Sequence, residues 1–346
     1  MIASPQKYEE AKAKIKQTPS VWLITGVAGF IGSNLLEELL KLDQRVVGLD
    51  NFFNGLKSNL DDVKTAVGEE KWENFKFIEG DITDLETCRK ACENVDYVLH
   101  HAAVGSVPRS IKDPLFSHKN NDLGFINMLV AAEEAKVRRF IFASSSSTYG
   151  DDQILPKVEH RRGNLLSPYA ATKYAGELYA DVFSRCYGLD YIGLKYFNVF
   201  GKHQRPDSEY AAVIPKWISS MIKGEMVYIF GDGETSRDFC YVENNIQANI
   251  LAATTQDPAA INQIYNIAVG EKTTLNELHK MLQHELGNAL PQHQKSAPVY
   301  QDFRKGDIGH SLADISKARK LLGFEPQYKV KEGIKLAIGW YLKKLK

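Results

Sequence analysis

The sequence predicts an α/β fold, in which a doubly wound parallel sheet is followed by a smaller C-terminal α/β region. Short apolar segments rich in β-forming residues alternate with amphipathic helical patterns, and this alternation is typical of parallel sheets. The chain has 346 residues, which is enough for about two domains. Its composition of 44% hydrophobic and 25% charged residues is typical of folded globular proteins and excludes disordered and fibrous classes.

The main sheet region is predicted at 20–198. Residues 1–19 before it are polar and helix-prone without a decisive apolar face, so we interpret them as an N-terminal extension. Strands are expected at 21–25, 45–50, 75–81, 95–103, 138–146 and 191–198. The helical patterns between them include 33–42, 123–135 and 170–188.

A second region is predicted at 199–346, because prolines and short segments become more frequent after residue 198. Within it, a helix at 243–254 precedes a strand at 263–269. This pair repeats the helix-then-strand rhythm of the N-terminal half. We therefore expect residues at about 236–269 to pack back on the first sheet.

The charge balance limits the classes of partner. Forty-three Lys and Arg residues offset 43 Asp and Glu residues, so the chain lacks the positive field that attracts nucleic acids and anionic membranes. We expect no nucleic-acid partner, no membrane partner and a small-molecule ligand. No window approaches ~18 uninterrupted apolar residues. Because the N-terminus is charged rather than apolar, we expect no signal peptide and a cytoplasmic location.

The four cysteines, Cys88, Cys92, Cys186 and Cys240, have spacings that fit neither a zinc site nor a disulfide framework. We interpret them as buried, reduced thiols. Cys88 and Cys92 lie one turn apart in an apparent helix, which explains their spacing. No metal site is predicted.

A glycine-rich turn joins the strand at 21–25 to the helix that follows it. Gly26, Gly29 and Gly32 are spaced so that the backbone can turn tightly, approach a pyrophosphate and present N–H groups at the start of the helix. A tight turn without a ligand is the alternative, because a glycine triplet alone is a weak motif.

Acidic residues at two strand ends support a dinucleotide site. Asp50 closes the second strand 24 residues after Gly26, where an acidic side chain would bond a ribose 2′-hydroxyl and repel a 2′-phosphate. The spacing therefore favours NAD over NADP. Asp81 and Ile82 follow the third strand, where they could meet the adenine edge; a plain strand-end turn is the alternative.

Tyr169 and Lys173 stand four residues apart near the start of a helix, so their side chains share one face. A tyrosine with a reference pKa of about 10 needs a shift of about 3 units, roughly 4 kcal/mol, to act as a base near neutrality. A nearby ammonium and a cationic nicotinamide supply such a shift. A solvated Tyr–Lys pair is the alternative.

A run of hydroxyl side chains from Ser144 to Thr148 ends the strand at 138–146. Ligands bind at the carboxyl ends of strands in open α/β sheets, and hydroxyl groups there can hold or pass a proton. A polar turn is the alternative. The glycine turn, the acidic residue, the hydroxyl run and the Tyr–Lys pair occur in this order on one alternating pattern, and the combination indicates a catalytic dinucleotide site.

These motifs resemble those of the extended short-chain dehydrogenases/reductases, and within them the nucleotide-sugar 4-epimerases. The resemblance extends from Val21 onward. It is carried by TGVAGFIGSNL, LDNF, GDI, HHAA, SSSSTYGD, SPYAATKYAGE, YFNVFG, VIPKW, GDGETSRDFCYVEN, YNIAVG and the late segment from FRKGD to KARKLLGFEP. It implies a Rossmann-type sheet at 20–198 that binds NAD and a nucleotide-sugar-binding region at 199–346.

The resemblance also implies residue roles. Tyr169 is expected to be the catalytic base, Lys173 to hold the nicotinamide ribose and tune the tyrosine, and Ser145 to be the catalytic hydroxyl. Cofactor contacts are expected from Gly26, Gly29, Phe30, Ile31, Gly32, Asp50, Asn51, Asp81, Ile82, Ala102, Asn121, Tyr169, Lys173 and Tyr196. Substrate contacts are expected from Ser106, Arg109, Ser145, Ser146, Tyr169, Asn198, Val213, Lys216, Tyr228, Phe230, Arg237, Arg304, Asp307 and Ser311.

The expected reaction is reversible C4 epimerisation. Related dehydratases carry an Asp–Glu pair after the strand-end hydroxyl, and related decarboxylases typically carry a Glu beside it, whereas this chain has Ser146 and Ser147 there. Tyr169 would remove the 4-hydroxyl proton while hydride passes from C4 to NAD. The 4-keto sugar would then rotate about its diphosphate, held by Arg237 and Arg304, and regain hydride on its other face.

Ser311 directs the substrate prediction to UDP-N-acetylglucosamine and UDP-N-acetylgalactosamine. By the resemblance, a Tyr at this position crowds the sugar 2-position in epimerases confined to plain hexoses, whereas a serine leaves room for an N-acetyl group. The segment GSVPRS at 105–110 resembles the corresponding segment of the epimerases that prefer these N-acetyl sugars. In this segment, Ser106 or Arg109 would either contact the sugar or only stabilise the loop. The product would supply surface polysaccharide assembly, including O-antigen.

Other interpretations of the sequence remain open. Plain UDP-glucose is one alternative substrate, and UDP-glucuronate, with Arg109 on its carboxylate, is another. A non-catalytic NAD-binding regulator is the alternative from a different class. The family often forms a homodimer through the helix that carries Tyr169 and the segment at about 115–136, so we expect a homodimer.

Three positions complicate the resemblance. Gly309 and Lys195 stand where related chains tend to have Arg. Gly309 would loosen the segment that holds Ser311, because glycine is conformationally permissive. The additional Ser144 leaves the alignment of the hydroxyl run ambiguous, with Ser146 as the alternative to Ser145.

Overall fold

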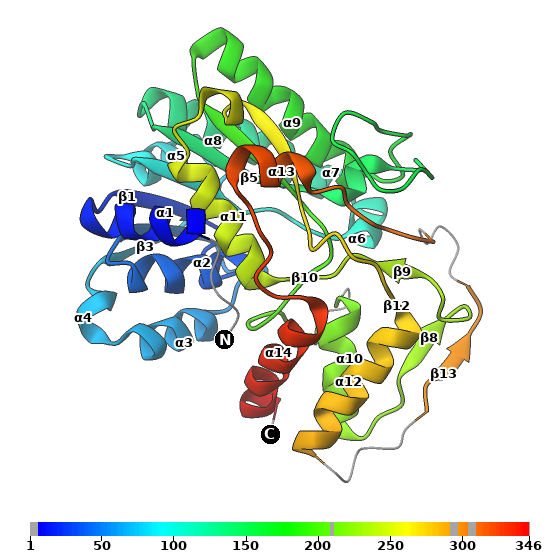
Figure 1. The fold of residues 1–346 in the computed structure, drawn as a ribbon. Coiled ribbons are helices and arrows are strands. Elements are labelled where there is room, and N and C mark those ends of the chain that lie inside the picture. The colour runs from blue at the N-terminus through cyan, green and yellow to red at the C-terminus, as the bar shows by residue number, and fades with distance from the viewer. Residues whose placement is uncertain (1–5, 208–210, 291–296, 304–308, 346) are drawn as a thin grey trace.

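The computed structural model describes residues 6–207, 211–290, 297–303 and 309–345 (Figure 1). Its centre is a seven-stranded parallel sheet with the order β11-β6-β5-β4-β1-β2-β3. The strands are β1 Val21–Thr25, β2 Arg45–Asp50, β3 Phe75–Glu79, β4 Tyr97–His100, β5 Arg139–Ser145, β6 Tyr191–Tyr196 and β11 Gln263–Ile267. This order confirms the predicted doubly wound sheet.

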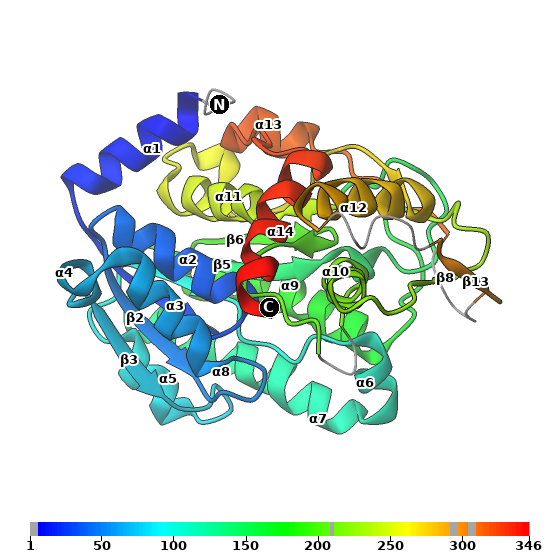
Figure 2. The ribbon, with the colours of Figure 1, turned by 90° about the horizontal axis from the view of Figure 1, so that it is seen from below.

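Helices cover both faces of the sheet because alternate strand residues are apolar on each side. Trp22 and Ile24 of β1 belong to one apolar core, and Leu23 belongs to the other. The first core includes residues of α2 Phe30–Lys41, α3 Lys57–Val67 and α11 Val242–Thr254. The second includes residues of α5 Leu85–Cys92, α8 Gly124–Glu134 and α9 Pro168–Tyr187. Figure 2 shows α11 on one side of the sheet and α5 and α8 on the other.

The smaller lobe lies beyond the carboxyl ends of the strands and has its own core (Figure 1). Three helices form most of it: α10 Val213–Lys223, α12 Leu275–Ala289 and α14 Val330–Leu345. Trp217, Leu278 and Ile334 are buried between these helices. A parallel pair of strands, β8 Tyr228–Phe230 and β13 Val299–Gln301, flanks them.

Short elements complete the described chain. They are α4 Glu69–Trp72, α6 Val107–Lys112, α7 Pro114–His118, η1 Lys119–Leu123, η2 Ser146–Tyr149, β7 Val199–Phe200, β9 Ser236–Arg237, β10 Cys240–Tyr241, η3 Pro258–Ala260, β12 Thr273–Thr274 and α13 Ser316–Leu322. β7 pairs with β10, and β9 pairs with β12. α11 and β11 return the chain from the smaller lobe to the sheet, where β11 pairs with β6.

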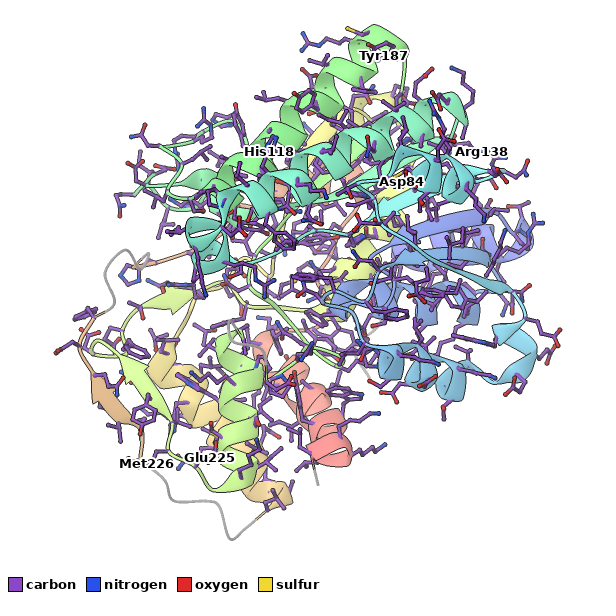
Figure 3. The ribbon with its side chains drawn as sticks, turned by 180° about the vertical axis from the view of Figure 1, so that it is seen from behind. Asp84, His118, Arg138, Tyr187, Glu225 and Met226 are labelled. Atoms are coloured by element: carbon purple, nitrogen blue, oxygen red, sulfur yellow. The ribbon has the colours of Figure 1, made fainter. Side chains whose placement is uncertain are left out.

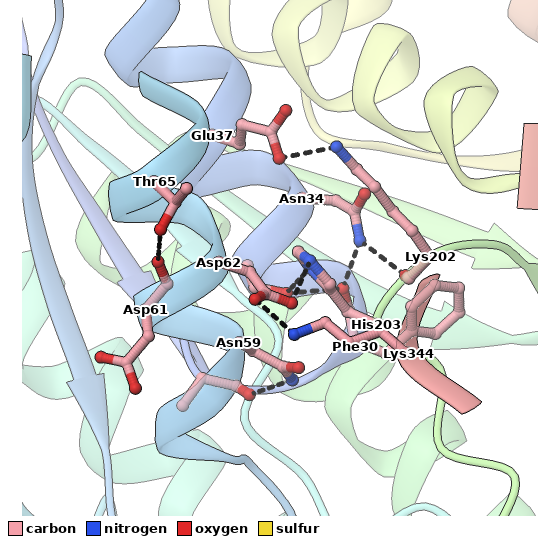
Figure 4. Close-up of polar contacts among 12 residues, drawn as sticks. Phe30, Asn34, Glu37, Asn59, Asp61, Asp62, Thr65, Lys202, His203 and Lys344 are labelled. Atoms are coloured by element: carbon pink, nitrogen blue, oxygen red, sulfur yellow. Dashed lines mark hydrogen bonds and ion pairs between the residues drawn. The ribbon is translucent and has the colours of Figure 1, made fainter. Parts of the chain in front are cut away.

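A polar cluster ties the smaller lobe to the first part of the sheet (Figure 4). Lys202 donates to Glu37 Oε2 at 2.6 Å, and Asn34 donates to the Lys202 carbonyl at 3.1 Å. At the C-terminal end of α14, Lys344 donates to Asp62 of α3 at 2.5 Å. These contacts hold α14 and the loop after β7 against α2 and α3, next to the glycine-rich turn.

The N-terminal extension contains a helix, α1 Gln6–Gln17, that packs on α11 and α2. The sequence shows no decisive apolar face here, yet Tyr8 and Ile15 are both buried. The Tyr8 hydroxyl donates to Glu38 of α2 at 3.4 Å. Two apolar side chains two turns apart are therefore enough to dock this polar helix.

The cysteine prediction needs one correction. Cys88, Cys92 and Cys240 are buried thiols, but Cys186 is exposed. Cys186 lies in the last turn of α9, which extends past the body of the sheet, so the general preference of cysteine for burial fails there. None of the described helices is long and apolar enough to cross a membrane.

Candidate active site

The glycine-rich turn leaves space at the start of α2 for an anionic ligand. Gly26 has φ +72°, and a Cβ there would lie 2.8 Å from the Ala102 nitrogen. A Cβ on Gly32 would lie only 2.1 Å from the Gly26 carbonyl oxygen, so the turn and α2 could not approach one another. The N-cap residue of α2, Gly29, supplies no side chain to its first N–H groups. These groups suit a phosphate.

Asp50 and its neighbours form the wall beside this turn. The Asp50 carboxylate accepts hydrogen bonds from the Ala28 nitrogen at 2.9 Å and the Phe52 nitrogen at 2.8 Å. Burial raises its pKa, and these backbone donors oppose the shift. Asn51 donates to Asp81 Oδ2 at 2.9 Å, which joins the ends of β2 and β3.

Tyr169, Lys173 and Ser145 meet where α9 packs on the end of β5. Ser167 caps α9 by accepting a hydrogen bond from the Ala170 nitrogen at 3.1 Å, which places Tyr169 in the first turn. The Ser145 hydroxyl lies beside the Tyr169 phenol, near enough to oppose the rise of the phenol pKa. Lys173 Nζ donates to the carbonyl of Ala143, in β5, at 2.8 Å.

Burial shifts the pKa of Tyr169 and the pKa of Lys173 in the directions that favour the neutral form of each side chain. It raises the pKa of Tyr169, which the Ser145 hydroxyl opposes. It lowers the pKa of Lys173 to about 8, which the charge of Asp122 opposes. The phenol therefore stays protonated near neutrality unless positive charge is brought close to it.

One cavity of about 520 Å³ connects the glycine turn with the Tyr169 cluster, and its size is typical of small-molecule sites. Most of the residues predicted to bind the cofactor line it. The predicted site residues in its wall are Gly26, Gly29, Phe30, Ile31, Gly32, Asp50, Asn51, Ile82, Ala102, Arg109, Ser145, Tyr169, Lys173, Tyr196 and Asn198. The structure thus joins residues from the ends of six strands in one site.

Comparison with known proteins is consistent with this geometry. The model of the NAD dependent epimerase/dehydratase family matches residues 22–268, which is more than half of the chain. The chain belongs to this family. A UDP-glucose 4-epimerase from Mycolicibacterium smegmatis is 34% identical over 93% of this chain and 98% of its own length.

Two solved structures of nucleotide-sugar epimerases are also similar to this chain. The UDP-N-acetylglucosamine 4-epimerase from Methanobrevibacter ruminantium, in complex with UDP-N-acetylmuramic acid, superposes with a TM-score of 0.85 at 37% identity, covering 94% of this chain and 99% of that one. The UDP-glucuronic acid 4-epimerase from Bacillus cereus, with UDP-glucuronic acid and NAD, superposes with a TM-score of 0.82 at 30% identity, covering 94% and 100%.

The residues of this epimerase/dehydratase family member fit NAD, the cofactor of the family. The glycine turn has neither side chains nor caps in the space that a pyrophosphate needs. Asp50 lies at the end of β2, facing the same cavity, and its carboxylate has acceptor capacity left for a ribose hydroxyl. Tyr169 and Lys173 line the same cavity, so a nicotinamide bound in it would be within their reach.

Some predicted site residues have structural contacts instead of lining the cavity. Asn121 accepts a hydrogen bond from the Val104 nitrogen at 2.7 Å and thereby fixes a wall of the cavity from behind. Ser106 caps α6 by accepting a hydrogen bond from the Arg109 nitrogen at 3.2 Å. This contact stabilises the loop, which was one of the two roles expected for Ser106. Ser146 is the first residue of η2.

The hydrogen-bond partners of Ser144 and Ser145 show which of these two serines faces Tyr169. Ser144 donates to Glu177 in the interior and is 3% exposed, so its hydroxyl is already engaged. Ser145 is the member of the run that reaches Tyr169. Ser145 also accepts a hydrogen bond from the Ser147 nitrogen at 3.1 Å, which fixes the start of η2.

The described residues of the smaller lobe that are predicted to contact the substrate do not line this cavity. Val213 and Lys216 are in α10, Tyr228 and Phe230 are in β8, and Arg237 is in β9. Ser311 follows the segment that runs beside β9, where its nitrogen donates to the Ser236 carbonyl at 3.0 Å. Arg304 and Asp307 lie outside the described residues.

Sequence reasoning missed His101, which lines the cavity beside Tyr196. Its imidazole stacks on the Tyr196 ring with 5.9 Å between centroids, and its Nε2 is 2.9 Å from the Tyr196 hydroxyl. Burial lowers the pKa of His101 to about 4, so the imidazole is neutral. The consecutive histidines at the end of β4 were the available signal, because that strand ends at the ligand edge of the sheet. Among the described residues, no group of three or more His, Cys, Asp and Glu side chains could hold a metal ion.

Proposed function

We propose that this protein interconverts UDP-N-acetylglucosamine and UDP-N-acetylgalactosamine by reversible epimerisation at C4 through a transient 4-keto sugar. The observation that carries this proposal is the convergence of the Ser145 hydroxyl, the Tyr169 phenol and the Lys173 ammonium in the wall of one cavity with the glycine turn. The family membership and the similar 4-epimerases support the reaction class.

The proton chemistry follows from the contacts of these three side chains. The Tyr169 phenolate would accept the proton of the sugar 4-hydroxyl, and Ser145 would orient the 4-oxygen and relay the proton in the opposite sugar pose. The Lys173 ammonium stabilises the phenolate from one turn along α9. NAD, when bound, supplies the hydride acceptor for oxidation of C4 and the donor for its reduction.

The set of acidic residues favours epimerisation over dehydration. Dehydration after C4 oxidation needs an acid and a base at the neighbouring carbons, whereas Ser146 and Ser147 follow the catalytic hydroxyl. Within the described chain, Asp50 is the only acidic side chain that lines the cavity, and it lies at the glycine turn. The site therefore supports a cycle that returns the sugar unchanged except at C4.

The smaller lobe would hold the UDP moiety while the sugar turns. Arg237 Nη1 donates to the carbonyls of Ser236 and Gly309, at 2.9 and 3.2 Å, which anchors the guanidinium between two segments of this lobe. We propose that Arg237 and Arg304 bind the diphosphate and that Asn198 and Asp307 bind the uridine. Val213, Lys216, Tyr228 and Phe230 would surround it.

Ser311 supports the N-acetyl sugar as substrate. Its nitrogen donates to the Ser236 carbonyl at 3.0 Å, which holds this segment beside β9. A small side chain here leaves volume for an acetamido group.

Substitution of Ser311 tests this substrate assignment. Ser311→Tyr is expected to lower turnover of UDP-N-acetylglucosamine by about 10- to 100-fold, because overpacking costs roughly 1–3 kcal/mol, and to leave UDP-glucose turnover within about threefold. Ser311→Ala is the matched control and keeps both activities. Product analysis by chromatography measures the ratio. Equal losses on both sugars would overturn the assignment.

UDP-glucuronate remains the second candidate substrate, since one similar solved structure contains it. Its C6 carboxylate would pair with Arg109, which lines the cavity near Asn54 and lies with its guanidinium 5.4 Å from the centre of the Phe53 ring. Parallel assays with UDP-glucuronate and UDP-N-acetylglucosamine separate the two candidates. Turnover of any of these sugars also excludes the non-catalytic regulator.

We also propose a homodimer formed through the outer face of α9 and α7. Leu115 of α7 is 79% exposed and Leu178 of α9 is 52% exposed, and Tyr179 and Val182 beside Leu178 are exposed as well. Figure 3 shows this face, with α9 running to Tyr187 and His118 at the end of α7. A second copy would cover these apolar side chains.

A further inference from the structure

A buried ion pair lies behind the catalytic hydroxyl and has no part in the chemistry described so far. Lys195 of β6 lies 2.8 Å from Glu177 Oε1 and 3.0 Å from Oε2, with Glu177 in the third turn of α9. The two residues are 3% and 8% exposed. Burying an ion pair is costly, and apolar replacements are often no less stable, so such a pair is weak support for a purely stabilising role.

The partners of this pair reach the chain on both sides of Ser145. Glu177 accepts a hydrogen bond from Ser144, the residue before Ser145. Lys195 donates to Thr148 Oγ1 at 2.7 Å, and Thr148 in turn donates to the carbonyl of Ser145 at 2.8 Å. The strand end that carries Ser145 is thus held from two directions by one pair of charges.

The same pair also fixes α9 relative to β5. Tyr169, Lys173 and Glu177 recur every four residues, so they lie on one face of α9. Each contacts the end of β5: Tyr169 through the Ser145 hydroxyl, Lys173 through the Ala143 carbonyl and Glu177 through Ser144. Glu177 therefore holds the helix that carries the phenol against the strand that carries the hydroxyl.

We propose that Glu177 and Lys195 are positioning residues that keep the Ser145 hydroxyl in register with the Tyr169 phenol. This inference rests on the proposed epimerase function and deepens it. Neither side chain lines the cavity, so both act through Ser144, Thr148 and the backbone of Ser145. The chemistry needs this precision, because a misplacement of about 1 Å in a proton-transfer site can cost about 100-fold in rate.

The test removes both charges together, since either residue alone would leave an unpaired buried charge. In the NAD-loaded full chain, the double variant Glu177→Gln/Lys195→Met is expected to lower kcat by about 10- to 100-fold and to leave KM within about threefold. Lys195→Arg keeps the charge and introduces the residue that related chains tend to have at this position, so its kcat is expected to stay within about threefold of the wild type.

The pair formed by Glu37 and Lys202 is the matched control. It also contains a carboxylate that is 8% exposed in its side chain, and none of its hydrogen bonds reaches β5 or α9. The double variant Glu37→Gln/Lys202→Met removes the same kinds of charge, and its kcat should stay within about threefold of the wild type. Assays run on UDP-N-acetylglucosamine, UDP-glucose and UDP-glucuronate in parallel. A changed preference among the sugars would indicate an effect on substrate selection, which concerns the proposed function. An equal loss on every sugar that the wild type converts would indicate an effect on the shared proton-transfer step, which is the effect proposed for the ion pair.

A second measurement separates positioning from general stabilisation. If the pair acts through Ser145, the double variant should cause less than about a threefold further loss of kcat in a Ser145→Ala background. Should the double variant fail to fold, Ser144→Ala replaces it, because it removes one hydroxyl and leaves the ion pair intact. The proposal is overturned if the folded, NAD-loaded variant retains wild-type kcat, or if its loss multiplies fully with that of Ser145→Ala.

Discussion

Lys173 occupies a position that serves the site and costs stability. Its ammonium lies between Ala143 and the cavity, and burial lowers its pKa to about 8, below the 10.5 of a solvated lysine. The native state therefore binds fewer protons than the unfolded state between about pH 8 and pH 10.5. Below pH 8 the ammonium is charged in both states, and its desolvation penalty is fully present. As the pH rises through this window, that penalty disappears.

Replacement of Lys173 by Met should reveal this cost. At pH 7 we expect Lys173→Met to raise the free energy of unfolding by about 1–2 kcal/mol, less than the full pKa shift implies because a hydrogen bond is lost and the cavity is partly solvated. The advantage should shrink to nothing by about pH 10.5, and turnover should fall to background. Denaturant unfolding at several pH values measures it, with Lys320→Met, at an exposed residue of α13, as the control. Destabilisation at pH 7 would contradict the account.

Residues that depend on spacing or backbone shape were predictable from the sequence. The glycine-rich turn could be predicted because a Cβ at Gly26 or Gly32 would collide with the backbone. The shared face of Tyr169 and Lys173 could be predicted because they are four residues apart in one helix. The cap formed by Ser106 was one of two alternatives left open by the sequence, whereas the contact of Asn121 with the Val104 nitrogen depends on loop closure, which no spacing reveals. The stacking of His101 on Tyr196 joins two strands that are 95 residues apart in the chain.

At the scale of the element, α9 has two faces with different tasks. Its inner face presents Tyr169, Lys173 and Glu177 to β5, while its outer face presents exposed apolar side chains such as Leu178 and Val182. The sequence predicted the helix but could not separate the faces, because periodicity alone does not distinguish a partner subunit from intramolecular packing.

A charge on the outer face tests the dimer. Leu178→Lys/Val182→Lys should convert the protein to a monomer, because desolvating two ammonium groups in an apolar interface costs several kcal/mol. Light scattering coupled to size-exclusion chromatography measures the mass. Met226→Lys, at a 54% exposed apolar residue on the smaller lobe (Figure 3), is the control and should stay dimeric. A wild-type monomer, or a double variant that remains dimeric, would contradict the proposal.

At the scale of the whole molecule, the doubly wound parallel sheet was predictable from patterns in the sequence, whereas the order of its seven strands is known only from the structure. Each strand alternates with a helix, and the unit at α11 and β11 repeats that rhythm after the smaller lobe. The docking of α1 and the polar cluster of Lys202, Glu37 and Asp62 were not predictable, since they depend on which segments of two lobes meet.

The central claim is that the hydrogen on C4 leaves and returns without mixing with water, while Tyr169 moves only the proton of the hydroxyl. The most direct test is turnover of UDP-N-acetylglucosamine that carries deuterium at C4, with mass spectrometry and NMR of the product. The account predicts that the deuterium is retained at C4 of UDP-N-acetylgalactosamine in ordinary water, and that Tyr169→Phe stops the conversion. Loss of the label to solvent, or solvent deuterium incorporated at C3 or C5 when the reaction is run in heavy water, would contradict it.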